Sequence, residues 1–270
     1  AHDFNDYEVG IRNKLEIINI FEKDGTINKN GVKEFIGLDR FEARKILVRK
    51  LKENGHLVKI ENIKNKVPYG DRSNTIIEPL LTEQWFVRAK KLSKKPIKIV
   101  KDGKTSFFPK NWTKIFFQWM KNIEPWCISR QIWWGHRIPA WYDENKNIFV
   151  AENEKEALFL AKKKNKNKKF VLKQETDVLD TWFSSALWPF ATMGWPAKTK
   201  ELSKFYPTSV LVTGFDIIFF WVARMLMMGN YFNKKTPFQK VYVHALVRDE
   251  KGQKMSKSKG NVIDPLELIN

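Results

Sequence analysis

Two apolar runs near the end of the chain constrain its fold most strongly. Residues 209–213 and 241–247 are rich in valine and carry almost no charge, and an apolar stretch at 216–228 is long enough for a helix between them. Strand, helix and strand in this order predict a βαβ unit. Because the two runs do not alternate with polar residues, they indicate parallel strands covered on both faces. The sequence therefore predicts an α/β fold built on a parallel sheet.

Chemically distinctive segments follow both predicted strands. Residues 214–216 come after the first strand, and a basic loop at 248–261 comes after the second. Ligands of open parallel sheets bind beyond the carboxyl ends of the strands. We therefore expect these two segments to meet at one edge of the sheet.

The basic loop carries five cations between residues 248 and 259, and it contains the unbroken sequence Lys254-Met255-Ser256-Lys257-Ser258. Glycines at 252 and 260 give its backbone freedom to close on a ligand. Mobile ammonium groups suit a reaction in which charge builds up on a leaving pyrophosphate. A solvated basic turn is the alternative for a loop of this composition.

Asp216 lies where the first strand gives way to the helix, a position at which a carboxylate commonly caps the helix. Its neighbours Ile217 and Trp221 suggest a second interpretation, a site for an α-ammonium group beside a small apolar side chain. Trp182 would add another indole wall to such a site. Packing is the alternative for each tryptophan in a chain this rich in aromatic residues.

The overall charge and the cysteine count limit the possible functions. With 49 Lys and Arg against 30 Asp and Glu, the net charge of +19 favours a polyanionic partner such as RNA. The excess is mostly lysine and accompanies abundant Asn and Ile, as an AT-rich genome would produce, so charge alone leaves RNA binding open. Six lysines at 162–169 are expected to be solvated. A single cysteine, Cys127, excludes an internal disulfide and a cysteine-based zinc cluster within the chain and fits a cytoplasmic location.

No membrane segment is expected, because Asp216 and Arg224 interrupt the apolar span at 210–228. The chain begins without methionine, which suggests a piece of a longer protein.

The first third of the sequence predicts a separate small unit, residues 1–82, with a different organisation from residues 83–270. Asp39 and Glu42 form a capping box for a helix ending at Gly55, with Ala43, Leu47 and Leu51 on one face. Residues 57–60 and 75–81 are expected to be strands. In the second part, residues 97–100 and 105–108 predict a hairpin around Asp102 and Gly103, and a helix should begin near Asn111.

Several longer runs resemble the valyl-tRNA synthetases, a family of class I aminoacyl-tRNA synthetases, and the similarity extends over essentially the whole chain. These are residues 126–131, 134–139, 177–189 and 214–225, together with the basic loop, whose K-M-S-K-S sequence resembles a class I signature. The isoleucyl-tRNA synthetases are the closest alternative, but they differ around Trp182 and Asp216. The resemblance implies that residues 83–270 form the second half of a doubly wound, Rossmann-like catalytic domain.

The resemblance also implies the reaction and the role of each matching residue. Valine and ATP would form valyl-adenylate, and the valyl group would pass to tRNA(Val). Asp216 would bind the α-amino group, and Ile217, Trp221 and Trp182 would shape the valine pocket. Gly214, Lys254, Ser256 and Lys257 would bind ATP, with Lys254 and Lys257 catalytic and Lys257 stabilising the departing pyrophosphate.

Residues 1–7 resemble the hydrolytic editing domain of the same family, so residues 1–82 would be the C-terminal part of that α+β, β-rich insertion. Asp6 would then recognise a misacylated amino acid, whereas an Asx turn is the alternative for this aspartate taken alone. Editing is needed because an apolar pocket rejects the added hydroxyl of threonine by only about a hundredfold, a limit for which the valyl enzymes are themselves the standard example.

The remaining expectations also follow from the resemblance. ATP would bind with Mg²⁺, and the full-length protein would be a monomer. No zinc is expected, because Trp141 and Tyr142 are followed by Asp143 and Glu144, where some relatives have cysteine. The first class I signature and the anticodon-binding region are absent, so we expect the isolated chain not to charge tRNA. A non-catalytic RNA-binding protein and a stand-alone editing hydrolase are the alternatives.

Overall fold

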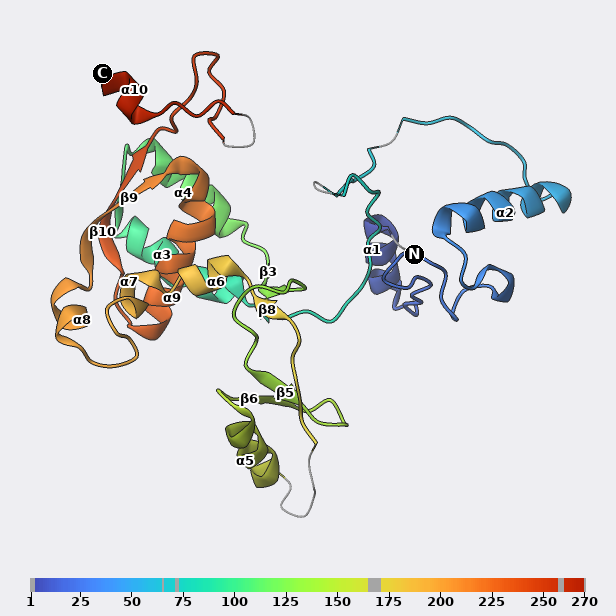
Figure 1. The fold of residues 1–270 in the computed structure, drawn as a ribbon, viewed down its shortest axis with the longest axis horizontal. Helices are drawn as coiled ribbons and strands as arrows, with labels where there is room; N and C mark the ends of the chain where they lie inside the picture. The colour runs from blue at the N-terminus through green and yellow to red at the C-terminus, as the bar shows by residue number, and fades with distance from the viewer. Residues whose placement is uncertain (1–2, 65, 71–72, 165–170, 257–259, 270) are drawn as a thin grey trace. The chain divides into compact units, whose positions relative to one another are not determined.

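The computed structural model describes residues 3–64, 66–70, 73–164, 171–256 and 260–269. The chain separates into two compact units, residues 1–83 and residues 84–270 (Figure 1). Each unit has its own buried core. They are therefore described one at a time.

The first unit is a small helical structure. It contains α1 (Phe4–Asn13), the single 3-10 turn η1 (Lys33–Phe35) and α2 (Arg40–Glu53). Asp39 caps α2 as predicted, because its carboxylate accepts a hydrogen bond from the Phe41 amide at 2.8 Å. Glu42, the other half of the predicted capping box, pairs instead with Lys45 at 2.8 Å, and the helix ends at Glu53. Ala43 of α2 is buried, but Leu47 is 44% exposed, and Ile46 packs on the core in its place.

The predicted strands of the first unit are wrong. No strand forms at 57–60 or 75–81, and Val58 is 98% exposed. Among the described residues of this unit, β-type backbone pairing is limited to isolated bridges such as Tyr69 with Ile76. A short apolar run becomes a strand only where a neighbouring strand satisfies its amide and carbonyl groups, and here no such neighbour is in place.

A parallel sheet organises the second unit. Its strands are β2 (Ser106–Phe108), β9 (Thr208–Gly214) and β10 (Phe238–His244), in the order β2-β10-β9. β9 and β10 pair in parallel from Phe238 opposite Thr208 to His244 opposite Gly214. The predicted βαβ unit is confirmed, and both strands end at the same edge of the sheet.

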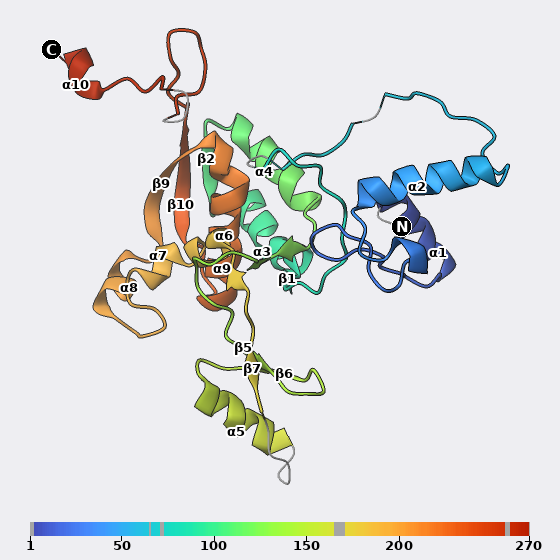
Figure 2. The same cartoon turned by 45° about the vertical axis from the view of Figure 1, so that its right-hand side comes forward.

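The segment between β9 and β10 is not one regular helix. It begins with a 3-10 turn, η2 (Phe215–Ile217), continues as a π-helix, η3 (Ile218–Ala223), and ends as α9 (Arg224–Phe232). Together with α3 (Ala89–Lys101) and α4 (Asn111–Lys121), α9 lies on one face of the sheet in both views (Figures 1 and 2). The main core forms between this helical layer and the sheet.

The opposite face of the sheet is open, contrary to the prediction of cover on both faces. Val210, Val212 and Tyr242 are 51%, 60% and 54% exposed. The apolar runs have no polar alternation because both faces carry apolar side chains, but α3, α4 and α9 all pack on the same one. An apolar composition indicates the character of a sheet face but not whether a helix covers it.

The hairpin predicted at 97–108 is also wrong. Residues 97–100 form the end of α3, and only residues 106–108 are a strand. Asp102 is the C-cap of α3, and Gly103 follows it with a φ of 72°, so that the Lys104 amide bonds to the Ile99 carbonyl at 3.0 Å. The Asp-Gly pair therefore ends a helix where a hairpin turn was predicted, while the helix predicted at Asn111 is confirmed as α4.

Shorter elements complete the second unit. They are β1 (Phe86–Val87) with β3 (Trp126–Cys127), β4 (Ser129–Arg130) with β8 (Val178–Leu179), the sheet of β5 (Ala140–Tyr142), β6 (Ile148–Val150) and β7 (Lys173–Gln174), and the helices α5 (Glu154–Lys164), α6 (Thr181–Ser185), α7 (Trp188–Ala191), α8 (Lys200–Phe205) and α10 (Pro265–Ile269). The sheet of β5, β6 and β7 packs on α5 around its own small core, which includes Trp141 and Phe149.

Within the described residues, one stretch, Phe215–Phe232, has the length and hydropathy of a membrane-crossing helix. Seven residues of α9, Arg224 to Asn230, are buried in this protein. A mostly buried helix under a sheet is the ordinary core helix of an α/β domain. The segment is therefore accounted for by the fold, as the sequence predicted.

Glu175 joins the ends of several short strands through its carboxylate. Its two oxygens accept hydrogen bonds from the Tyr142 hydroxyl at 2.7 Å, the Trp85 indole at 3.2 Å and the Thr176 amide at 2.8 Å. Desolvation raises the pKa of Glu175, but these hydrogen bonds together outweigh it, and the pKa lies below its usual value.

A lowered pKa predicts acid sensitivity in the second unit. Because the unfolded chain binds the proton more tightly, the contribution of Glu175 to stability is complete above its unfolded pKa and is lost as the pH falls through the lower folded value. Glu175→Gln should remove that part of the pH dependence and destabilise the unit by about 1–3 kcal/mol, because one amide end would face hydrogen-bond donors. Urea unfolding of both proteins between pH 7 and pH 3, followed by tryptophan fluorescence, measures the free energy of unfolding at each pH. If this free energy fell equally with pH in both proteins, the prediction would be contradicted.

Candidate active site

The turn after β9 places a carboxylate at the carboxyl edge of the sheet. Thr213 and Gly214 are buried, and the chain leaves the strand through the 3-10 turn that contains Asp216. No side-chain capping bond is present at the start of η2 or of η3. The capping interpretation of Asp216 is therefore wrong in this structure, and its carboxylate faces another group.

That group is Lys254 of the basic loop. Lys254 Nζ donates to Asp216 Oδ2 at 2.9 Å, with the two side chains 61% and 35% exposed. The residues are 38 positions apart in sequence, and they follow neighbouring strands. The predicted meeting of the two segments at one sheet edge is confirmed by this contact.

The described part of the basic loop is shaped by its own polar residues. Asp249 accepts from the Gln253 amide at 2.7 Å and from the Asn261 amide group at 2.7 Å, and Arg248 bonds to the Gly252 carbonyl. Asn261 Oδ1 also accepts from the Ser256 amide at 2.9 Å. These bonds return the chain on itself, so that Lys254 projects towards Asp216. Lys257 lies outside the described residues, and its predicted role stays a prediction.

Gly214 allows the carboxylate to sit where it does. A Cβ atom at this position would lie 2.7 Å from Asp216 Oδ1 and 3.2 Å from a methyl carbon of Leu246. Contacts below 3.0 Å force a movement, and the short Asp216 side chain is the group free to move. The absence of a side chain at residue 214 therefore matters for the position of the carboxylate.

Gly214→Ala should displace the Asp216 carboxylate without unfolding the protein. We expect the contact of this carboxylate with Lys254 to weaken, because a misplaced charged hydrogen bond loses part of its roughly 1.5–3 kcal/mol. The NMR chemical shift of the Asp216 carboxyl carbon measures the change, and thermal unfolding serves as the folding control. An unchanged shift in a folded variant would refute the argument.

The predicted pocket tryptophans lie on two neighbouring elements. Trp221 is in η3 and donates from its indole to the Ser185 carbonyl of α6 at 3.1 Å. Trp182 of α6 packs against Phe220, with ring centroids 5.9 Å apart. Ile217 is half-buried at the end of η2. Asp216, Ile217 and Trp221 thus share one continuous segment, and Trp182 reaches it from α6.

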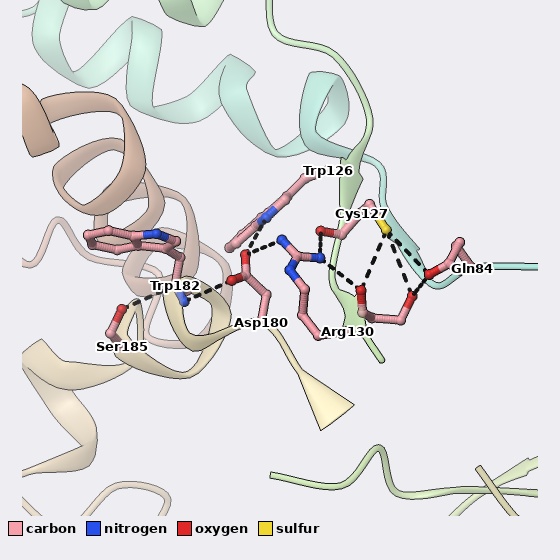
Figure 3. A network of polar contacts seen from close by, with 8 residues as sticks. Gln84, Trp126, Cys127, Arg130, Asp180, Trp182 and Ser185 are labelled. Carbon is pink, nitrogen blue, oxygen red and sulfur yellow. Dashed lines mark hydrogen bonds and ion pairs between the residues drawn. The ribbon is translucent and has the colours of Figure 1, made fainter. Parts of the chain in front are cut away.

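A polar network beside α6 was not predicted from the sequence. Asp180 is buried, and its carboxylate binds the Trp126 indole at 3.0 Å, Arg130 at 3.2 Å and the Trp182 amide at 3.3 Å (Figure 3). Arg130 also donates to the carbonyls of Cys127 and Ser129. Asp180 is 54 residues from Trp126, so no local sequence signal could have paired them.

The first unit contains the residue predicted for editing. Asp6 is exposed in the first turn of α1, and the Asx-type bonds are made by Asp3, whose carboxylate accepts from the amides of Asn5 and Asp6. The Asx-turn alternative therefore belongs to Asp3. An apolar pocket of about 240 Å³ lies beside α1, lined by Phe4, Tyr7, Ile17 and Leu80 among others, but Asp6 does not line it.

Across the residues that the structure describes, no group of three or more His, Cys, Asp or Glu side chains is arranged to hold a metal ion. Asp143, which follows the Trp141–Tyr142 pair, binds the amide of Asn147 at 2.8 Å and closes a turn. The expectation that no zinc binds stays a prediction.

Comparison with known proteins covers nearly the whole chain. Residues 5–270 match the family model described as tRNA synthetases class I (I, L, M and V). The valine--tRNA ligase of Pelagibacter ubique is 71% identical over 269 residues, and that of Legionella pneumophila is 58% identical over 270 residues. The chain is covered completely in both comparisons, but it spans only 31% and 29% of the two relatives.

A solved structure agrees on the fold. A Mycobacterium tuberculosis methionyl-tRNA synthetase, solved in complex with methionyl-adenylate, matches 98% of this chain and 47% of its own, with a TM-score of 0.50 and 16% identity. At this identity the match supports the architecture alone. Helices and a parallel sheet of the class I type are therefore shared, while the half-domain and editing-domain boundaries stay predictions.

Proposed function

The chain belongs to the class I tRNA synthetases of the isoleucine, leucine, methionine and valine group, and from this premise we propose that it is part of a valine--tRNA ligase. The proposed reaction is ATP-dependent activation of L-valine followed by transfer to tRNA(Val). The identity of 71% to one valine--tRNA ligase supports the choice of amino acid. The observation that carries the site is the contact of Asp216 with Lys254 at the carboxyl edge of the sheet.

Activation requires positioning and charge, and no protein nucleophile. The valine carboxylate attacks the α-phosphorus of ATP, a new C–O–P link forms, and the bond to the β-phosphate breaks with its electrons leaving on pyrophosphate. Asp216 would hold the α-ammonium group of valine, which fixes the carboxylate for attack. Ile217, Trp182 and Trp221 would enclose the isopropyl group.

The basic loop would act on the phosphates. Lys254 and Lys257, with the backbone around Ser256, would stabilise negative charge as it builds up on pyrophosphate. Gly214 leaves room for ATP to approach the backbone at the end of β9. Mg²⁺ would enter the site bound to the phosphates of ATP, since this ion is commonly held through substrate phosphates and water.

Editing of threonyl-tRNA(Val) by the first unit, with Asp6 as a recognition residue, is part of the same proposal. It is supported by the family resemblance of residues 1–7 and by the chemical need for a second selection step. A cytoplasmic location, with the full-length protein acting as a monomer, completes it.

A chimera tests the function directly. These 270 residues would replace the matching segment of the Pelagibacter ubique ligase, and ATP–pyrophosphate exchange would be measured with valine, threonine and isoleucine. We expect valine-dependent exchange in the chimera close to that of the parent ligase, and none in the 270-residue chain alone. A preference for isoleucine would support the isoleucyl alternative. A folded chimera inactive with every amino acid would overturn the proposal and favour an RNA-binding role.

A further inference from the structure

Arg224, the first residue of α9, places a charged group inside the aromatic core of the second unit. It is 5% exposed, and its guanidinium carbon lies 4.0 Å from the centroid of the Trp126 ring and 4.6 Å from that of Phe219. Burial lowers the pKa of Arg224 to about 10, and Asp180 acts in the opposite direction. The group therefore stays protonated at neutral pH.

Stability alone does not account for this arginine. Its Nη1 atom is buried without a hydrogen-bond partner in the described part of the chain. A buried cation with an unsatisfied donor costs free energy, and a well-packed apolar side chain of similar volume is often as stable or more stable. We therefore look for the role of Arg224 in the side chains and backbone that its contacts hold in position.

The contacts around Arg224 form a closed loop that passes through both pocket tryptophans. The Trp126 ring lies under the Arg224 guanidinium. Its indole N–H donates to Asp180, and Asp180 caps α6 at Trp182 (Figure 3). At the other end of α6, the Ser185 carbonyl accepts from the indole of Trp221. Trp221 precedes Arg224 by three residues, so the loop returns to its starting point.

The backbone inside this loop is unusual and needs support. Ile218–Ala223 form a π-helix, which ends directly before Arg224. Such turns are uncommon and are found frequently at functional sites. Phe219, which stacks on Arg224, and Trp221, which bonds to α6, both belong to the π-helix. The guanidinium is thus fixed to the segment whose geometry sets the direction of the Trp221 side chain.

We propose that Arg224 and Asp180 are positioning residues for the amino-acid pocket, holding the π-helix and α6 so that Trp221 and Trp182 face the side chain of the bound amino acid. This rests on the proposed function of the site. Both residues are buried, and in this proposal they act through Trp126, Trp221 and α6. Their loss should therefore affect recognition of the amino acid more than recognition of ATP.

Arg224→Met in the chimera tests the proposal, because methionine fills similar space without charge. We expect the KM for valine to rise about tenfold, as for a desolvated cation–π contact, while the KM for ATP changes less than about twofold. Arg224→Lys keeps the cation over the Trp126 ring and should recover part of the loss. Arg40→Met is the matched control: Arg40 is a nearly buried arginine over the Phe41 ring in the first unit, and its loss should leave the KM for valine unchanged.

A second readout does not depend on enzyme activity. In the 270-residue chain labelled with ¹⁵N-tryptophan, Arg224→Met should shift the indole N–H resonances of both Trp126 and Trp221, whereas Arg40→Met should shift neither. If the unmutated chimera were inactive, the proposed function would fail. The NMR measurement would still show whether Arg224 is connected to Trp126 and Trp221.

Three results would overturn the proposal. One is a folded Arg224→Met enzyme with an unchanged KM for valine. Another is a parallel rise in the KM values for valine and ATP that follows lost thermal stability, which would indicate a merely structural role. If Arg224→Met does not fold, the isosteric Asp180→Asn replaces it. Asparagine keeps an oxygen for the cap, but an NH₂ group takes the place of Oδ2, which accepts from Trp126 and pairs with Arg130. An unchanged KM for valine in folded Asp180→Asn would also overturn the proposal.

Discussion

Asp216→Asn is expected to raise the KM for valine in the chimeric ligase by about 10- to 100-fold, with a smaller change in the KM for ATP. Asparagine has the shape of aspartate but not its charge, and a hydrogen bond between charged partners contributes about 1.5–3 kcal/mol. At about 1.4 kcal/mol for each factor of ten, that range gives the expected effect. The dependence of exchange rate on valine concentration measures it.

The control is a second exposed lysine–aspartate pair in the same unit. Asp102 binds Lys98 at 2.6 Å at the end of α3, and Asp102→Asn removes a charge in the same way. This variant should have the KM values of the unmutated chimera. Equal effects of the two substitutions would show that Asp216 acts through net charge and does not bind the amino acid.

Phe107→Ala is expected to destabilise the second unit by about 3–5 kcal/mol, the range for removing a large buried aromatic side chain. Phe107 is 1% exposed in β2, and its ring lies 5.1 Å from that of Phe116 in α4. Its loss leaves a cavity between the sheet and the helical layer. β2 has three residues, and among the described strands it pairs with β10 alone, so few backbone hydrogen bonds offset the lost packing.

Tryptophan fluorescence during urea unfolding isolates this effect, because all 11 tryptophans lie between residues 85 and 221, in the second unit. Phe205→Ala in α8 is the matched control, since Phe205 is 52% exposed and its loss should cost less than about 1 kcal/mol. Comparable unfolding midpoints for the two variants would mean that Phe107 does not hold β2 to the core.

The sequence predicted those parts of the fold in which local pattern and tertiary environment agree. Residues 208–214 and 238–244 are valine-rich and separated by a long apolar segment, so pattern and burial both specify a βαβ unit. The Asp39 cap needed only a local hydrogen bond. Residues 97–100 had the composition of a strand, but Ser93, Pro96 and Val100 are spaced as one face of a helix and are buried in α3. In this segment the helical spacing of buried residues over the whole of α3 decided the structure, and not the composition of four residues.

The candidate site divides in the same way. Asp216 and the basic loop were predicted together because parallel strands bring their carboxyl ends to one edge. Asp180, Trp126 and Arg224 were not, because each has an ordinary local explanation as a cap, a core ring or a surface cation. Only the folded chain shows that one carboxylate meets an indole from a strand 54 residues away. The π-helix likewise has no sequence signal that separates it from an α-helix.

The ion pair between Lys254 and Asp216 has a consequence for the order of events in the proposed enzyme. A lysine ammonium group already occupies the carboxylate on which the ammonium group of valine would bind. In the proposed enzyme the two cations would compete for this carboxylate, so binding of valine would release Lys254. By linkage, the factor by which valine weakens the hold of Lys254 on Asp216 equals the factor by which that hold weakens the affinity for valine. Arrival of the amino acid would free the loop to reach the phosphates of ATP. In this way the contact between Lys254 and Asp216 would couple the binding of valine to the position of the basic loop that binds ATP.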